Sequence, residues 1–163
     1  MSNTPLIGIV MGSASDAPTM RKAAAILEEF GIPYEIKVCS AHRTPARAHA
    51  YGTTAKERGL KCIIAAAGMA AHLAGVMGSL TTLPILGVPM DGKFMGGLDA
   101  LLATVQMPKG IPVATFTVGS HGAVNAALFA VAMLAVNDPE MSKKLDDYRA
   151  KQTAAIPEDL PAE

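Results

Sequence analysis

The chain has 163 residues, of which 50% are hydrophobic, 17% are charged and 4% are aromatic, and its 14 Lys and Arg residues balance 14 Asp and Glu residues. Zero net charge and few aromatic side chains argue against nucleic-acid binding, which needs basic surface and stacking groups. The most apolar stretch, 123–136, is too short for the roughly 20 residues of a membrane span. With no secretory leader visible and with Cys39 and Cys62 typical of buried reduced thiols, we expect a cytoplasmic protein.

Apolar runs of strand length alternate with segments of helical period, and Gly, Pro or a capping residue separates them. The predicted strands are 6–11, 34–39, 62–67, 84–88 and 112–118. The predicted helices are an Ala-rich helix ending at Phe30-Gly31, a helix from the capping residue Thr44 to Arg58, a short one within 68–79, and helices at 98–107, 123–136 and 139–153.

The predicted strands are apolar throughout, which is typical of a sheet covered on both faces, and strand-helix alternation predicts parallel connections. We therefore expect a three-layer α/β fold with a central parallel sheet. One domain spans 1–163, with a core at 6–153 and a tail at 154–163. The helix at 123–136 is apolar on nearly every side, which predicts a place in the core or in an interface between copies of the chain.

Ligands of open parallel sheets bind outside the carboxyl ends of the strands, so the loops after the strands are the place to look for chemistry. The loop after the first strand contains Ser13, Ser15 and Asp16 directly before a helix. A helix start with two hydroxyls can bind a phosphate. The alternative is that Ser15 or Asp16 simply caps the helix.

The loop after the second strand places His42 next to Arg43 at another helix start. Arginine binds phosphate in a bidentate manner and histidine titrates near neutral pH, so the pair indicates an anionic substrate and a proton transfer. The alternative is a surface Arg beside a capping His. His49, further along the same helix, is expected to be an exposed bystander.

After the third strand, residues 65–71 are small apart from Met69, and His72 follows them. Such a bare loop leaves room for a flat ring, or it serves tight packing of helix on sheet. His121, after the fifth strand, has no obvious partner. Residues 106–110 precede that strand, so topology places them on the opposite edge, from which they could reach a neighbouring subunit's site. The dispersed His and Cys residues predict no metal site.

These loops resemble one family when they are taken together. The motifs are Met-Gly-Ser-Ala-Ser-Asp at 11–16, Ser-Ala-His-Arg-Thr-Pro at 40–45, Ala-Ala-His-Leu at 70–73, Leu-Gly-Val-Pro at 86–89 and Val-Gln-Met-Pro-Lys-Gly-Ile-Pro-Val at 105–113. In order and spacing they are similar to the PurE family, whose members are 5-(carboxyamino)imidazole ribonucleotide mutases of purine biosynthesis. The resemblance implies a flavodoxin-like fold, a homo-octamer, a ribonucleotide substrate and no cofactor.

Site residues follow from the same resemblance. His42 would be the acid and base of an isomerase that moves a carboxylate from the exocyclic nitrogen of the imidazole to ring carbon 4. Ser13, Ser15 and Arg43 would hold the 5′-phosphate, and Asp16 would hold the ribose hydroxyls. The residues that would wall the imidazole and the migrating carboxylate are Ser40, Gly68, Ala70, Ala71, His72 and Leu73.

Some positions depart from the family's pattern. Ala46 replaces an acidic residue, Ala66 and Met69 replace Gly, and Ala74 replaces Pro. These changes keep open a second hypothesis, a catalytically inactive nucleotide-binding paralogue with a regulatory role. We expect the Met69 side chain to pack away from the substrate. Arg43 and His72 favour the mutase branch over the branch that uses free carbon dioxide.

Overall fold

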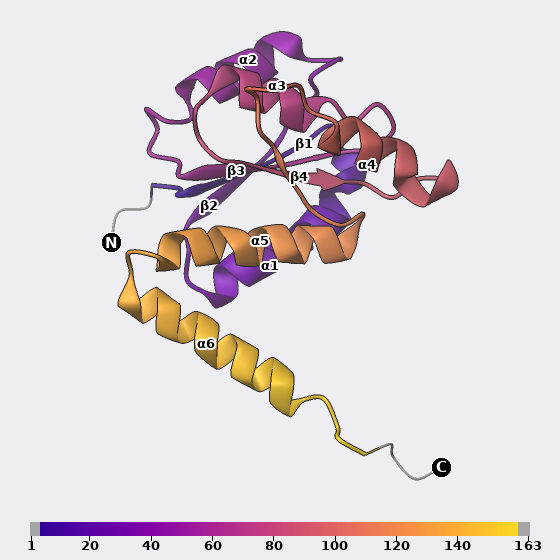
Figure 1. Cartoon of the computed structure of the whole chain (residues 1–163). Coiled ribbons are helices and arrows are strands. Elements are labelled where there is room, and N and C mark those ends of the chain that lie inside the picture. The colour runs from indigo at the N-terminus through magenta and orange to yellow at the C-terminus, as the bar shows by residue number, and fades with distance from the viewer. Residues whose placement is uncertain (1–3, 160–163) are drawn as a thin grey trace.

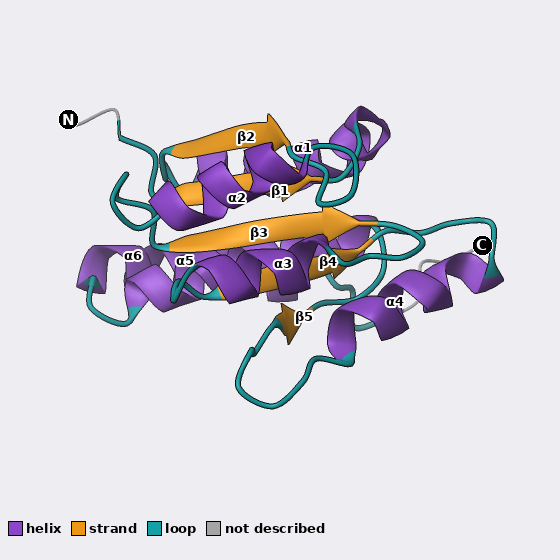
Figure 2. Cartoon of the chain, turned by 90° about the horizontal axis from the view of Figure 1, so that it is seen from above, coloured by secondary structure: helices purple, strands orange, loops and turns teal. Residues whose placement is uncertain are grey.

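The computed structural model describes residues 4–159, and a five-stranded sheet forms its centre (Figures 1 and 2). All neighbouring strands are parallel and their order is β2-β1-β3-β4-β5. The strands are β1 (Ile7–Met11), β2 (Tyr34–Val38), β3 (Cys62–Ala67), β4 (Ile85–Pro89) and β5 (Ala114–Thr115). The predicted α/β class with a central parallel sheet is confirmed.

Helices cover both faces of this sheet, as Figure 1 shows. One face carries α1 (Ala17–Glu29) and α5 (Ser120–Ala135), and the other carries α2 (Pro45–Thr54), α3 (Leu73–Leu80) and α4 (Leu98–Val105). Short 3₁₀ turns, Ala14–Asp16 and Met95–Gly97, precede α1 and α4. The last helix, α6 (Pro139–Ala154), packs on α5 and extends away from the sheet.

Two apolar clusters lie between the layers, one on each face of the sheet. Ile9 and Leu86 belong to the cluster under α1 and α5, whereas Val10 and Ile63 belong to the cluster under α2 and α3. Every residue of β1 and β4 is buried, because these strands are covered on both faces. Continuous apolar runs in the sequence therefore correspond to the central strands, as predicted.

Two expected elements differ in length from the structure. The fifth strand is two residues long, not seven. At its start, Pro112 has no N–H to donate to the neighbouring strand. At its end, the chain leaves the sheet after the Phe116 amide donates to the Gly87 carbonyl. The second helix ends at Thr54, and the chain then turns to Gly59, whose φ of +93° suits glycine. β2 is also more exposed than predicted, since it is an edge strand with Val38 41% exposed.

The two cysteines are free and buried, as predicted, and burial raises the pKa of the Cys62 thiol to about 12. Within residues 4–159, no helix combines the length and the apolar character that crossing a membrane would require. The helix expected at 139–153 is confirmed as α6. Of the expected tail at 154–163, residues 160–163 lie outside the described part of the chain, and 155–159 are not helical.

Candidate active site

Three of the loops singled out in the sequence meet at one edge of the sheet. The strand order places β1 between β2 and β3, so the loops that follow these strands are neighbours at their carboxyl ends. Backbone bonds tie the strand ends together, since the Cys39 amide donates to Met11 and the Gly12 amide donates to Ala66. The segments 12–16, 39–44 and 68–72 therefore form a continuous rim.

The loop after β1 is organised by its own hydroxyl groups. Ser13 has extended backbone angles, and its Oγ accepts from the Ser15 amide at 3.3 Å and from the Ser15 hydroxyl at 2.8 Å. Ser13 thus caps the short 3₁₀ turn. Asp16, one of the two residues that the sequence offered as a cap of the helix, stands at the N-cap position of α1, but its side chain makes no cap bond. Burial raises the pKa of Asp16, although the Ser15 hydroxyl and the Arg43 charge act in the opposite direction.

The loop after β2 folds around Ser40, which is 8% exposed. Its Oγ accepts from the Arg43 amide at 3.1 Å, and its carbonyl accepts from the amide and the hydroxyl of Thr44 at 3.0 and 2.9 Å. Thr44 occupies the N-cap position of α2, as predicted, but its side chain makes no cap bond, because its hydroxyl is used on Ser40. Ser40 therefore shapes the turn that presents the next three residues.

Arg43 connects the first two loops. Its Nη2 donates to the Gly12 carbonyl and its Nε donates to Ser40 Oγ at 3.4 Å, while the residue as a whole is exposed. The guanidinium is thereby anchored at the start of the loop after β1, without an ion-pair partner within residues 4–159. A cation held by neutral acceptors keeps its charge available for an anionic ligand.

His42 and His72 meet across the end of β1. The Nε2 atom of His42 lies 2.9 Å from Nδ1 of His72, and the two rings are edge-on with centroids 4.9 Å apart. Both histidines are exposed. They lie 30 positions apart in the sequence, on loops of different strands, so the fold assembles a titratable pair that neither motif contains alone.

The loop after β3 combines backbone strain with little side-chain bulk. Met69 has φ +55° and is 78% exposed, so its side chain does not pack into the core of the chain. By contrast, Ala71 and Leu73 are 1% and 2% exposed, and Leu73 belongs to the core cluster under α2 and α3. Any contact of Ala71 or Leu73 with a ligand would therefore use backbone atoms. Ala70 is exposed on the rim, and Gly68 lies against Met90.

Gln106 is not on the opposite edge, so the topological argument was wrong for this residue. Together with His72 and Met107 it lines a cavity of about 460 Å³ between α3 and α4. The cause is visible in Figure 2, where α4 lies alongside and beyond the carboxyl ends of the strands. Met107, just beyond the end of α4, lies against Gly75 in the first turn of α3.

Asp91 is a rim residue that the motif search missed. It follows β4, its carboxylate packs against Gly119, and its charge contributes to the raised pKa of Asp16. Its place in the loop that follows the predicted strand 84–88 was the signal that could have found it. His121 lies exposed in the first turn of α5 without a side-chain hydrogen bond to any residue of 4–159.

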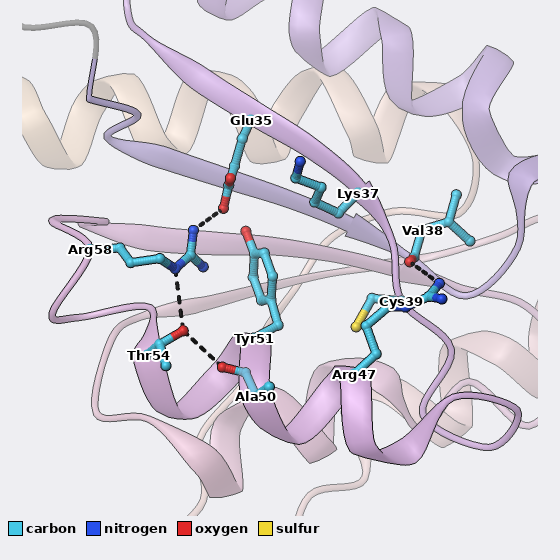
Figure 3. A pocket seen from close by; sticks show the side chains of 9 residues that line it. All are labelled: Glu35, Lys37, Val38, Cys39, Arg47, Ala50, Tyr51, Thr54 and Arg58. Carbon is cyan, nitrogen blue, oxygen red and sulfur yellow. Dashed lines mark hydrogen bonds and ion pairs between the residues drawn. The ribbon is translucent and has the colours of Figure 1, made fainter.

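A second cavity, of about 450 Å³, lies between β2 and α2, and no predicted site residue lines it (Figure 3). There Glu35 forms an ion pair with Arg58, and the Arg58 guanidinium lies over the Tyr51 ring, 4.7 Å from its centroid. Across the whole described chain, no three His, Cys, Asp or Glu side chains are grouped closely enough to hold a metal ion.

Comparison with known proteins agrees with this arrangement. The family model described as AIR carboxylase matches residues 6–155. The chain is 56% identical over 147 residues to an N5-carboxyaminoimidazole ribonucleotide mutase of Pyrococcus horikoshii, covering 90% of this chain and 82% of the relative. Relatives of the same name from Bacillus subtilis and Vibrio cholerae are 54% and 51% identical, and each alignment covers over 90% of both chains.

The fold agrees with solved structures as well. The crystal structure of Treponema denticola PurE superimposes with a TM-score of 0.82 at 28% identity and covers 92% of both chains. A second crystal structure, of a single-residue variant of Treponema denticola PurE2, gives a TM-score of 0.84 at 27% identity with the same coverage of 92%. The central parallel sheet is thus that of a flavodoxin-like fold, and the chain belongs to the AIR carboxylase family.

Proposed function

We propose that the chain is an N5-carboxyaminoimidazole ribonucleotide mutase of purine biosynthesis, an isomerase that converts its substrate to 4-carboxy-5-aminoimidazole ribonucleotide. Identity above 50% to mutases of that name over about 90% of the chain carries the proposal. The convergence of an anchored Arg43 and the histidine pair at one rim supports it. An inactive paralogue has no comparable support.

Each part of the ribonucleotide is assigned to residues of the rim. We assign the 5′-phosphate to Arg43 and to the hydroxyls of Ser13 and Ser15, which would turn from each other toward the phosphate oxygens. Asp16 would accept hydrogen bonds from the ribose hydroxyls. The imidazole and the migrating carboxylate would then lie over the loop after β3. The residues assigned to this wall are Ser40, Gly68, Ala70, Ala71, His72 and Leu73.

His42 would act first as acid and then as base. A protonated His42 gives its proton to the exocyclic nitrogen as the bond from that nitrogen to the carboxylate breaks and carbon dioxide leaves. Carbon 4 of the ring then attacks the carbon dioxide and forms the new carbon-carbon bond. Neutral His42 removes the proton from carbon 4, which restores the aromatic ring and regenerates the acid.

No proton is gained or lost over the cycle, so no co-reactant is needed. Carbon dioxide has to be retained between the two steps, and a closed site provides this by raising its effective concentration. The bare loop after β3 leaves the required room next to His42.

Synthetic N5-carboxyaminoimidazole ribonucleotide tests the proposal when product absorbance is followed without ATP and without added bicarbonate. We expect turnover that is independent of both. Binding of the ribonucleotide without turnover would identify an inactive paralogue. Turnover only of the decarboxylated ribonucleotide with bicarbonate would instead identify a carboxylase.

We also propose that the enzyme is a single-domain protein of the cytoplasm that assembles as a homo-octamer. Exposed apolar side chains on α4 and α5 support the assembly, because isolated chains rarely leave such surface in water. Leu102 is 49% and Phe129 is 46% exposed. Leu102→Asp should reduce the sedimenting mass with secondary structure intact, and Lys144→Asp on the polar helix α6 is the matched control. A stable wild-type monomer at micromolar concentration would contradict the assembly.

A further inference from the structure

The hydrogen bond between His42 and His72 is not needed to hold either of the two loops in its conformation. Ser40 holds the backbone of the loop after β2, and the Ala70 carbonyl accepts from the His72 amide at 2.9 Å. His72 stands at the N-cap position of α3, yet its side chain makes no cap bond. Both rings are therefore free of the roles that histidines commonly have at helix starts, and within residues 4–159 each ring is hydrogen-bonded to the other.

An N–H···N bond between two imidazoles needs one donor and one acceptor. If Nδ1–H of His72 donated to Nε2 of His42, then the Nε2 lone pair, the only one at which neutral His42 can take up a proton, would be occupied by this hydrogen bond. Protonation of His42 would then place two N–H groups face to face and break the bond. That arrangement cannot last through a cycle in which His42 changes between acid and base.

The opposite arrangement lasts through the whole cycle. When Nε2–H of His42 donates to Nδ1 of His72, His42 gains and loses its proton at Nδ1, on the other side of the ring. The bond is then present in both protonation states, and it is stronger when His42 is charged, since a charged donor makes a shorter and stronger hydrogen bond.

We infer that His72 is a positioning residue that accepts Nε2–H of His42 in both protonation states, so that Nδ1 of His42 is the nitrogen that exchanges protons with the substrate. This inference rests on the proposed acid-base role of His42. The T-shaped contact of the rings, at an interplanar angle of 87°, fixes the plane of the His42 ring as well as its tautomer.

Two substitutions of His72 distinguish a role as hydrogen-bond acceptor from a role that only fills space. In His72→Asn, the amide oxygen stands near the place of Nδ1 and can accept from His42, whereas in His72→Leu no acceptor is left. We expect kcat of the Leu variant to be at least tenfold below that of the Asn variant, with KM values within about threefold of each other. His49→Leu, on the exposed face of α2 and outside the site, is the matched control and should keep wild-type turnover.

Equal kcat values for the Asn and Leu variants would overturn the inference. A change in KM alone would do the same, because either result would mean that His72 only lines the site. Circular dichroism and thermal melting of each variant identify misfolding. If the Leu variant fails to fold, the Asn variant and the spectroscopic measurement described next decide the matter.

Magic-angle-spinning NMR of the ¹⁵N-histidine-labelled wild type identifies the tautomer of each ring directly. The chain has four histidines, so few signals have to be resolved. His42→Asn and His72→Asn assign their signals. We expect neutral His42 to carry its proton on Nε2 and to lose this preference in His72→Leu. A neutral His42 protonated on Nδ1 beside a His72 that donates from Nδ1 would overturn the inference.

The acid-base role of His42 and the positioning role of His72 can be contradicted separately. If His42→Asn keeps wild-type turnover, the proposed acid-base role of His42 is wrong, whatever the tautomers are. If His42→Asn is inactive while the His72 variants are alike or the tautomer is reversed, the proposed function stands and the positioning role of His72 falls.

Discussion

Helix α2 has polar side chains clustered near each of its ends, and the two clusters behave differently. Near its start, His42 and Arg43 are exposed, and Arg43 is held by neutral acceptors on Gly12 and Ser40. Beyond its end, Arg58 is paired with the carboxylate of Glu35 and lies on Tyr51 (Figure 3). A cation whose charge is already neutralised stabilises the fold, whereas one held without a counter-charge is ready for a ligand.

The two clusters also differ in how small residues are used around them. A Cβ at Gly8 would clash with Tyr51 Oη, so the central strand β1 lacks a side chain where Tyr51 packs. At the rim, small residues leave space open instead of filling it. The presence of charged residues in a cavity is therefore a poor guide to function. Whether their charges are already paired is a better one.

The largest effect expected at the rim follows His42→Asn. Asparagine keeps polarity and much of the volume but cannot cycle a proton, so kcat should fall by about 10²- to 10⁴-fold. Affinity for the ribonucleotide should stay within about tenfold. Stopped-flow turnover and calorimetric binding measure the two quantities separately. A variant with near wild-type turnover would exclude His42 as the acid and base.

Arg43→Ala tests whether the unpaired cation is the phosphate anchor. Loss of a charge-assisted hydrogen bond should cost about 1.5–3 kcal/mol, which corresponds to roughly 10- to 150-fold in KM. The variant should also lose most of its preference for the nucleotide over the nucleoside. Steady-state kinetics with both substrates measures this preference. An unchanged preference would assign phosphate binding to other residues.

Arg58→Met should behave in the opposite way, lowering stability and sparing turnover. Methionine keeps apolar contact with Tyr51 but leaves Glu35 without its cation, at a cost of about 1–3 kcal/mol in the free energy of unfolding at pH 7. Thermal melting at fixed protein concentration measures the loss. A clear drop in kcat without loss of stability would mean that this cluster serves the reaction.

The loss in Arg58→Met should also depend on pH. Burial raises the pKa of Glu35, but the hydrogen bond from Arg58 and the charge of its guanidinium outweigh this, so its folded pKa lies below the ordinary value of 4.5. A carboxyl with a depressed folded pKa stabilises the fold above its unfolded pKa and ceases to do so as pH falls through the folded pKa. The difference in melting temperature between wild type and variant should therefore shrink below about pH 4.5. A difference that is independent of pH would mean that the ion pair is not its cause.

Met69→Gly is expected to have the smallest effect. From the sequence we expected Met69 to pack away from the substrate. With the Met69 side chain 78% exposed and φ at +55°, little burial is lost and backbone strain is relieved, so stability should rise by up to about 1 kcal/mol. Turnover should change less than threefold. Met69→Ala, which keeps the strain, is the control, and a tenfold gain in turnover for Gly would mean that Met69 obstructs the site.

Much of the site was predictable because local patterns create it. Hydroxyls before a helix start and a His-Arg pair after a strand are visible in single motifs, and parallel topology brings them to one edge. The role of Ser40 was not predictable, since its hydroxyl could face a ligand or its own loop. The structure shows that it holds the Arg43 amide.

The sequence by itself determined the α/β class, the bounds of the buried strands to within a residue, and the rim at which His42 and Arg43 lie. Burial on both faces makes central strands apolar throughout, and that pattern is local. Tertiary structure alone decided the contact of His42 with His72 and the place of Gln106 beside His72. These depend on how loops of different strands turn and on where α4 ends, because such distances are set by packing between segments that are far apart in the chain.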